Sequence, residues 1–222
     1  MDAQQLSGFL RPVRHVLLDF DGPVCSVFAG LPAPVVAARL SASLGDPSAR
    51  WAGEDDPMAV LRFVDVDRPE AVATTDGLLE RLENEAVRVA EPTPGADLVL
   101  KACADTGRAV WIVSNNAESA IRAYLAQHGL RGYVSGVFGR VLGEPSAMKP
   151  NPRLLADAMA AASAQPADCV FIGDTVTDVQ AGDAAGVPTI GYANKPGKDA
   201  ALTGAGAATV VPSMHALADG FS

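Results

Sequence analysis

The chain has few cysteines. Only three of its 222 residues are cysteine, Cys25, Cys103 and Cys169, and no two of them form a CxxC pair. An odd number without paired spacing argues against a disulfide framework and against a structural zinc site. Free thiols persist in reducing compartments, so we expect the protein to be cytoplasmic.

Basic residues are also scarce. The chain carries 17 Lys and Arg against 26 Asp and Glu, a net charge of -9. Such an acidic chain repels phosphate backbones and anionic headgroups, which argues against nucleic acid and membrane surfaces as partners. No apolar run reaches the roughly 18 residues that a membrane span needs, and we expect no signal peptide. Small ligands remain, and we expect a monomer or homodimer.

What the chain does have is enough apolar residues for a sizeable core, 49% against 19% charged. Short apolar runs closed by turn residues indicate buried strands, and stretches with helical spacing separate them. The predicted strands are 16–18, 109–113, 169–172, 189–191 and, less regular, 208–211; the predicted helices are 96–105, 118–127, 152–162 and 176–185. This alternation predicts an α/β fold, a doubly wound parallel sheet covered by helices on both faces.

Residues 27–91 break the alternation. They contain no clear strand, carry twice as many acidic as basic residues, and end in the proline-rich stretch 91–95. Helical patterns occupy 34–44, 57–64 and 69–90, the last with Leu78, Leu79 and Leu82 at helical spacing. We therefore predict a core domain made of residues 1–26 and 92–222, with 27–91 as a small inserted helical domain.

Polar residues follow three of the predicted strands. They lie in Asp19-Phe20-Asp21-Gly22, in Ser114-Asn115-Asn116 and in the stretch from Gly173 to Asp178. The carboxyl ends of parallel strands converge on one crevice, so these side chains are expected to meet there. Clustered carboxylates repel one another unless a cation lies among them, and hard oxygen ligands favour Mg²⁺.

Each of these residues also has a structural interpretation. Asp19 and Asp21 are common turn residues, and Asp174 or Ser114 could cap the helix that follows it. Lys149 alone would be a solvated surface lysine. Only the joint pattern indicates a site.

That joint pattern resembles a known family. Asp19-Phe20-Asp21-Gly22, Ser114, Lys149-Pro150 and Gly173-Asp174-x-x-x-Asp178 have the order and spacing of the haloacid dehalogenase-like (HAD) hydrolases, among them the phosphoglycolate phosphatases. The resemblance spans nearly the whole chain, because the insertion after the first motif is similar to the family's cap domain. The carboxylate at Asp21 indicates the phosphatase branch, since the dehalogenases lack one there.

The resemblance implies a role for each residue. Asp19 would be the nucleophile that forms an aspartyl-phosphate, and Asp21 the general acid and base. Ser114, Asn115 and Lys149 would bind the phosphoryl group, with Lys149 neutralising charge. Mg²⁺ would be held by Asp19, the backbone carbonyl of Asp21, Asp174 and Asp178. The expected substrate is a small phosphorylated metabolite.

One residue departs from the family pattern, and two other functions stay open. Pro23 stands where these phosphatases usually carry Thr, Ser or Ala, and it lacks a backbone N–H. A sugar phosphomutase similar to β-phosphoglucomutase would share Asp19, Asp21, the metal and the cap. A non-catalytic binding protein that kept the fold is the other alternative, which the intact motifs disfavour.

Other polar residues are weaker candidates. Four arginines of the insertion could contact an anionic substrate, although each also suits a surface: Arg39, Arg50, Arg62 and Arg68. His15, His128 and His215 lack metal-ligand spacing, so we expect them to be structural. Cys25 is expected to be a buried, unreactive thiol.

Overall fold

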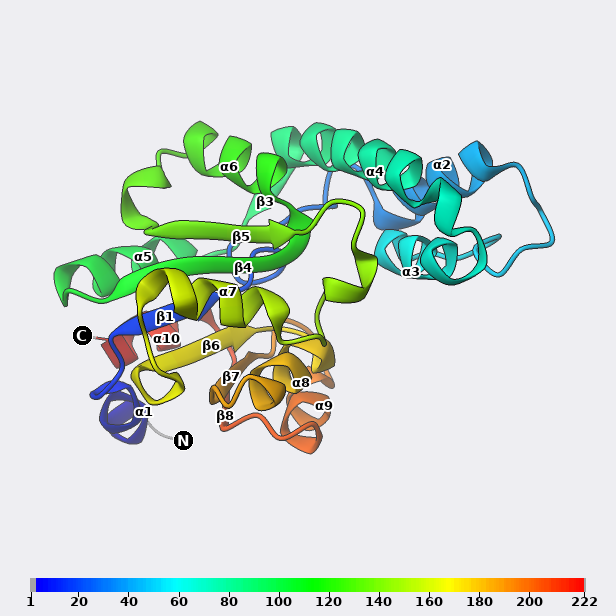
Figure 1. The fold of residues 1–222 in the computed structure, drawn as a ribbon. Coiled ribbons are helices and arrows are strands. Elements are labelled where there is room, and N and C mark those ends of the chain that lie inside the picture. The colour runs from blue at the N-terminus through cyan, green and yellow to red at the C-terminus, as the bar shows by residue number, and fades with distance from the viewer. Residues whose placement is uncertain (1–2, 222) are drawn as a thin grey trace.

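The computed structural model describes residues 3–221. Its centre is a parallel sheet of six strands, in the order β5-β4-β1-β6-β7-β8 (Figure 1). The strands are β1 (His15–Leu18), β4 (Ala109–Ala117), β5 (Gly136–Arg140), β6 (Cys169–Gly173), β7 (Thr189–Tyr192) and β8 (Thr209–Val211). Five of them were predicted from the sequence, including the irregular fifth.

Helices cover both faces of this sheet, which confirms the predicted doubly wound α/β fold. They are α1 (Ala3–Leu10), α5 (Ala96–Asp105), α6 (Glu118–Gln127), α7 (Arg153–Ala162), α8 (Val176–Ala184), α9 (Lys198–Gly204) and α10 (Met214–Phe221). Side chains of β1 alternate between the faces: Val16 and Leu18 belong to one buried cluster with α1, α5, α6 and α10. Leu17 belongs to a second cluster with α7 and α8.

The insertion is helical, as predicted. It contains α2 (Ala33–Leu44), α3 (Pro57–Asp67) and α4 (Val72–Ala86), with one-turn 3-10 helices at Pro69–Ala71 and Val87–Val89. These helices lie together beyond the carboxyl ends of β4 and β5 (Figure 1). A two-residue antiparallel pair, β2 (Cys25–Ser26) with β3 (Glu91–Pro92), brings the two connections to the sheet side by side.

Strand β5 was missed because glycine weakens the strand pattern. Both glycines of β5 lie where a side chain would clash. A Cβ on Gly136 would come within 2.8 Å of the Trp111 ring, and one on Gly139 within 2.5 Å of the Glu118 backbone nitrogen. Helices α1, α9 and α10 were also missed, each being no longer than eight residues.

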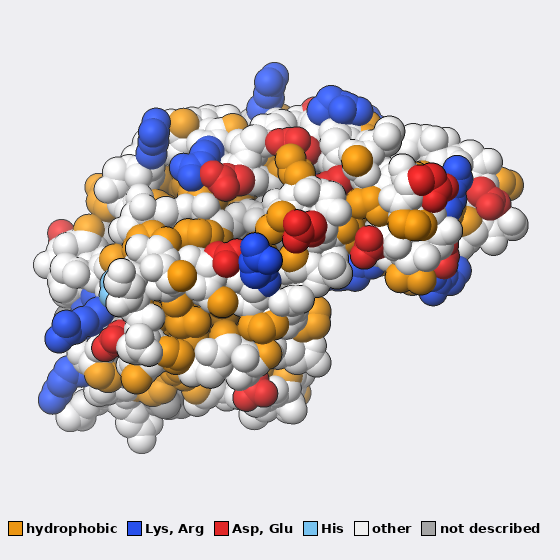
Figure 2. All heavy atoms as spheres, in the orientation of Figure 1, with side chains coloured by type: hydrophobic (Ala, Val, Ile, Leu, Met, Phe, Trp, Pro, Cys, Tyr) orange, Lys and Arg blue, Asp and Glu red, His pale blue; other side chains and the backbone are white. Residues whose placement is uncertain are grey.

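One face of the surface is seen in Figure 2. On the face in Figure 2, Lys and Arg side chains are interspersed with Asp and Glu and do not gather into one basic patch. Within residues 3–221, no helix is long and apolar enough to cross a bilayer.

Candidate active site

Three strand ends form the site. Asp19 directly follows β1, Asp174 directly follows β6, and Ser114 lies in β4, which flanks β1 on the other side. The Asp19 amide donates to the Ile172 carbonyl (2.9 Å), so the two carboxylate-bearing turns leave the sheet together. The predicted convergence of these residues is therefore seen in the structure.

Three aspartates form a buried carboxylate cluster. One oxygen each from Asp19, Asp174 and Asp178 lies within 4.8 Å of the others. All three side chains are almost entirely buried, at 6%, 6% and 0% exposure. Oxygen ligands at this spacing suit a hard divalent cation such as Mg²⁺.

Lys149 lies against this cluster. Its Nζ contacts Asp19 Oδ1 at 2.8 Å and Asp178 Oδ1 at 2.6 Å, and it donates to the Val113 carbonyl at 3.2 Å. These three acceptors match the three N–H groups of an ammonium. The Lys149 side chain is only 3% exposed, so the surface-lysine interpretation is wrong.

Asp178 is held by helix α8 itself. It is the third residue of that helix, and its Oδ2 accepts from the Asp174 amide (3.1 Å), the Thr175 amide (3.0 Å) and the Thr175 hydroxyl (2.6 Å). In return, the Asp178 amide donates to the Thr175 hydroxyl oxygen at 3.2 Å, which completes a capping box. The cap fixes the Asp178 side chain so that its other oxygen faces Lys149.

Asp21 lies beside the cluster rather than in it. Its Oδ1 accepts from the Val27 amide at 2.9 Å, and its carboxylate is not among the three clustered oxygens. The neighbouring Gly22 has φ +105°, and a Cβ there would come within 2.5 Å of the Asp174 carboxyl carbon. Only glycine fits that turn, which brings Asp21 close to Asp174. Its predicted metal contact through the backbone carbonyl stays a prediction.

Burial changes the acidity of both motif aspartates. Desolvation raises the pKa of Asp19 to about 7, against the lowering effect of Lys149 and with added repulsion from Asp178 and Asp174. Desolvation also raises the pKa of Asp21 to about 6, opposed by the Val27 amide. Burial therefore favours the neutral form of both carboxyl groups more than exposure to water would.

Asn115 and Ser114 are placed by short polar contacts. The Asn115 side chain accepts from the Lys149 amide (2.8 Å) and donates to the Lys149 carbonyl (3.3 Å). The Ser114 hydroxyl donates to Asn116 Oδ1 at 3.1 Å and is buried. Both lie within β4 rather than after it, at a shift in the pairing with β5.

Two residues of the site were missed in the sequence. Asn194 donates to Asp174 Oδ2 at 3.0 Å, and the Lys198 ammonium pairs with the same oxygen. Both follow β7, whose carboxyl end neighbours that of β6. The rule that strand ends carry the site, applied to the fourth predicted strand, would have found them.

Three of the four candidate arginines of the insertion form ion pairs within the insertion, and one contacts the rest of the protein. Arg39 pairs with Glu85, Arg50 with Asp67, and Arg68 with Glu70, all within the insertion. Arg62 instead donates to a residue outside the insertion, the Lys149 carbonyl, at 3.0 Å.

Histidines and Cys25 fill structural positions, as the sequence indicated. His15 lies 3.3 Å from the Trp111 indole nitrogen, and His128 stacks on Tyr124. His215 packs against Gly95. Burial raises the pKa of the Cys25 thiol above its usual range, which suppresses the reactive thiolate.

Pro23 is buried in the turn after Asp21. The Phe20 carbonyl accepts from the amides of Val24 (3.0 Å) and Cys25 (3.2 Å), and the Thr93 hydroxyl donates to the Gly22 carbonyl at 2.5 Å. These contacts fix the turn without using the amide that proline lacks.

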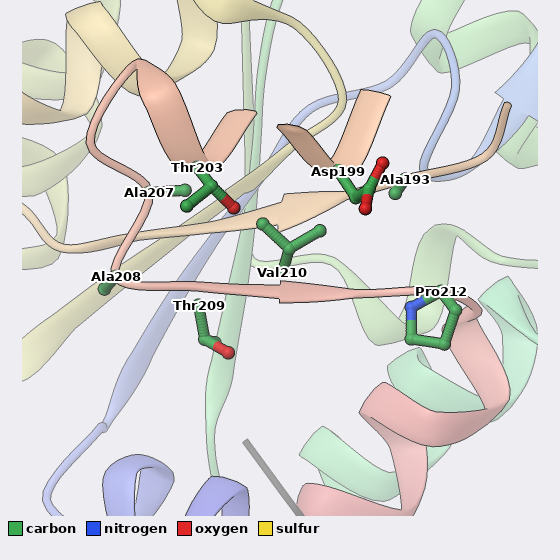
Figure 3. A pocket seen from close by; sticks show the side chains of 8 residues that line it. All are labelled: Ala193, Asp199, Thr203, Ala207, Ala208, Thr209, Val210 and Pro212. Carbon is green, nitrogen blue, oxygen red and sulfur yellow. The ribbon is translucent and has the colours of Figure 1, made fainter. Parts of the chain in front are cut away.

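A hollow of about 430 Å³ lies elsewhere, beside β7, α9 and β8 (Figure 3). Asp199 is the one charged residue that lines it, and none of the clustered aspartates does. Its described lining includes no Lys or Arg, so it offers a phosphate ester no cationic side chain.

Comparison with known proteins agrees with this geometry. A family model described as haloacid dehalogenase-like hydrolase matches residues 13–186. The chain belongs to the haloacid dehalogenase-like hydrolases. It is 31% identical to a phosphoglycolate phosphatase of Xylella fastidiosa, over 86% of this chain and 84% of that one. It is 32% identical to a plasmid phosphoglycolate phosphatase of Cupriavidus necator, over 93% and 92%. The expected enzyme class, a phosphatase of this family, is thereby confirmed.

Solved structures show the same fold. A haloacid dehalogenase-like protein of Streptococcus pneumoniae has a TM-score of 0.70 at 14% identity, covering 96% of this chain and all of that one. A HAD family hydrolase of Deinococcus radiodurans has a TM-score of 0.61 at 26% identity, covering 93% of each chain, and its crystals contained bound phosphate and sodium.

Proposed function

We propose that this phosphatase hydrolyses a small-molecule phosphate monoester through an aspartyl-phosphate on Asp19, with Mg²⁺ as cofactor. The observation that carries the proposal is the buried Asp19 carboxylate, held by Lys149 and flanked by Asp174 and Asp178.

The carboxylate cluster fits a divalent cation. Three carboxylates meet there, and two ammonium groups contact them. The pKa of Asp19 is raised chiefly by burial and further by repulsion from Asp178 and Asp174, which a bound cation would offset. Asp19, the Asp21 carbonyl, Asp174 and Asp178 would hold Mg²⁺. When bound, the cation would neutralise the approach of an anionic ester to an anionic nucleophile.

Asp19 is oriented for attack. Its Oδ1 accepts from the Phe20 amide (2.7 Å) and contacts Lys149, which leaves Oδ2 as the attacking oxygen. A bond from Oδ2 to phosphorus forms while the bond from phosphorus to the leaving oxygen breaks. Ser114 and Lys149 would donate to the phosphoryl oxygens, and Asn115 would fix the Lys149 backbone.

Asp21 would move the protons. Its pKa of about 6 lies near physiological pH, where a group can both give and take a proton. In the first step it protonates the departing alkoxide. In the second it takes a proton from the water that attacks phosphorus, releasing inorganic phosphate and restoring Asp19.

The insertion would act as a cap that covers the site and limits it to small substrates. Arg62 is its candidate substrate contact, because it already reaches the Lys149 carbonyl. The two relatives named phosphoglycolate phosphatase make 2-phosphoglycolate the first substrate to test. The cytoplasm and a monomer or homodimer are our proposals for location and assembly.

A panel of phosphate esters with Mg²⁺ tests this function. We expect 2-phosphoglycolate or another small phosphate monoester to release inorganic phosphate. Isomerisation of a sugar phosphate that requires a sugar bisphosphate would instead identify a mutase. Failure to hydrolyse every ester and to bind Mg²⁺ would identify a binding protein.

A further inference from the structure

A second group of buried charges lies where α4 meets the ends of β4 and β5. Arg140, at the end of β5, pairs through Nε with Asp76 (2.7 Å) and through its two terminal nitrogens with Glu83 (3.0 Å each). The side chains of Arg140, Asp76 and Glu83 are 0%, 1% and 0% exposed. We call these three residues the α4 clasp.

Stability alone is a weak reason for such a cluster. Buried ion pairs lose much of their attraction to desolvation, and apolar residues of similar volume often stabilise a protein equally well. Burial lowers the pKa of Arg140, but Glu83 and Asp76 outweigh that effect and raise it, so the guanidinium stays charged. What a planar guanidinium and two carboxylates add is fixed geometry.

That geometry is imposed on the residues that follow Ser114. Glu83 accepts from the Asn116 side chain (2.9 Å) and from the Ala117 amide (3.1 Å). Arg140 donates to the Asn115 carbonyl at 2.7 Å. Three successive residues are therefore held by charged groups of the clasp.

The sheet itself does not hold this segment. Val113 pairs with Phe138 and Ala117 with Arg140, so four residues along β4 advance only two along β5. Residues 114–116 lie in this irregularity, outside the regular ladder. The clasp supplies the contacts that the ladder lacks.

From this segment the contacts lead directly to the site. Asn116 Oδ1 accepts from the Ser114 hydroxyl, and the Asn115 side chain binds the Lys149 backbone at two atoms. We propose that Asp76, Glu83 and Arg140 are positioning residues, which place the Ser114 hydroxyl and Lys149 for phosphoryl transfer by anchoring the segment 114–117 to α4. The catalytic part of this proposal rests on the proposed phosphatase function.

Glu83→Gln tests the proposal, with Glu85→Gln as the control. Both residues lie on α4, but Glu85 forms an exposed pair with Arg39. We expect Glu83→Gln to lower kcat by about tenfold to a hundredfold, the cost of a small misplacement, with a much smaller change in KM. Glu85→Gln should match wild type. Equal kcat for both variants, at matched folded fraction, would overturn the proposal.

Coupling to Ser114 separates positioning from general destabilisation. If Glu83 acts through Ser114, the Glu83→Gln effect on kcat should shrink by at least about threefold in a Ser114→Ala background. Fully additive effects would contradict the proposal. Should Glu83→Gln fail to fold, Asn116→Ala removes the link to Ser114 while leaving the ion pairs. We expect Asn116→Ala also to lower kcat, with a smaller effect in the Ser114→Ala background.

Amide hydrogen exchange tests the anchoring without any turnover. The Ala117 amide should exchange faster in Glu83→Gln than in wild type or Glu85→Gln, while amides of β7 stay unchanged. Unchanged exchange at residues 114–117 would refute the clasp even in an active enzyme. A wild type that hydrolyses nothing but shows the exchange effect would refute only the phosphatase function.

Discussion

The ionised form of Asp19, the proposed nucleophile, lowers the stability of the folded protein. Burial raises the pKa of Asp19 to about 7, whereas the pKa of an aspartate in an unfolded chain is about 4. The folded protein therefore binds more protons than the unfolded one between those two values. Its free energy of unfolding must fall as pH rises through that window.

We accordingly predict that Asp19→Asn stabilises the metal-free protein at pH 8. The Asn oxygen can keep the bond from the Phe20 amide, and Lys149 keeps Asp178. The gain in Tm should disappear near pH 4, where Asp19 is already neutral. Thermal unfolding in EDTA at both pH values measures it, and a variant less stable than wild type at pH 8 would contradict the cause given for the pKa.

Asp21 gives a prediction about leaving groups. Asp21→Asn should slow hydrolysis of an alkyl phosphate by about a hundredfold to ten-thousandfold, the usual contribution of a general acid. An aryl ester such as p-nitrophenyl phosphate leaves without needing a proton, so its first step should lose less. Single-turnover rates for the two esters make the comparison; equal losses would mean that Asp21 is not the acid.

A site residue could be predicted from the sequence only where its neighbours along the chain mark it. Asp19, Asp21, Asp174 and Asp178 stand next to strand ends in the sequence, so a local pattern finds them. Glu83 and Arg140 are 57 residues apart and are joined only by the fold. No local signal distinguishes these two from surface charges.

Among the strands and helices, close packing explains why β5 contains glycine and was not predicted from the sequence. A Cβ on Gly139 would meet the backbone at the start of α6, 2.5 Å from the Glu118 nitrogen. That space requirement removes the side chain that would have marked the strand. The strands predicted from the sequence were those with apolar runs, whatever their length. The missed strand β5 is rich in glycine, and the missed helices α1, α9 and α10 have no more than eight residues.

Gly139→Ala should therefore destabilise the protein by about 1–3 kcal/mol, the usual cost of overpacking. Gly132→Ala is the matched control, since a Cβ there would meet nothing within 4 Å. Urea unfolding of both variants provides the measurement. A neutral Gly139→Ala would show that α6 and β5 can separate without cost.

At the scale of the whole molecule, Arg108 joins the two ends of the described chain. It donates to the carbonyls of Val13 (3.2 Å), Phe221 (3.2 Å) and Leu10 (3.3 Å). Its guanidinium also lies over the Phe221 ring, 5.4 Å from the ring centroid. Helices α1 and α10 are thereby held together at the side of the sheet away from the insertion (Figure 1).

Arg108→Ala should lower the free energy of unfolding by about 1–3 kcal/mol, since buried carbonyls lose a charged donor. The exposed Arg11 provides the control, and Arg11→Ala should change little. Activity per folded molecule should be unchanged, because the contacts of Arg108 lie far from the carboxylate cluster in the fold. A loss of activity without a loss of stability would contradict this division of roles.

Metal-dependent phosphoryl transfer through Asp19 is tested most directly by phosphate release from p-nitrophenyl phosphate. Wild type and Asp19→Asn are compared, each with Mg²⁺ and with EDTA. We expect turnover by the wild type that EDTA abolishes, and none by the variant, which stays folded. Turnover by Asp19→Asn equal to wild type would contradict the mechanism. Wild-type turnover that EDTA leaves intact would contradict the role of the metal.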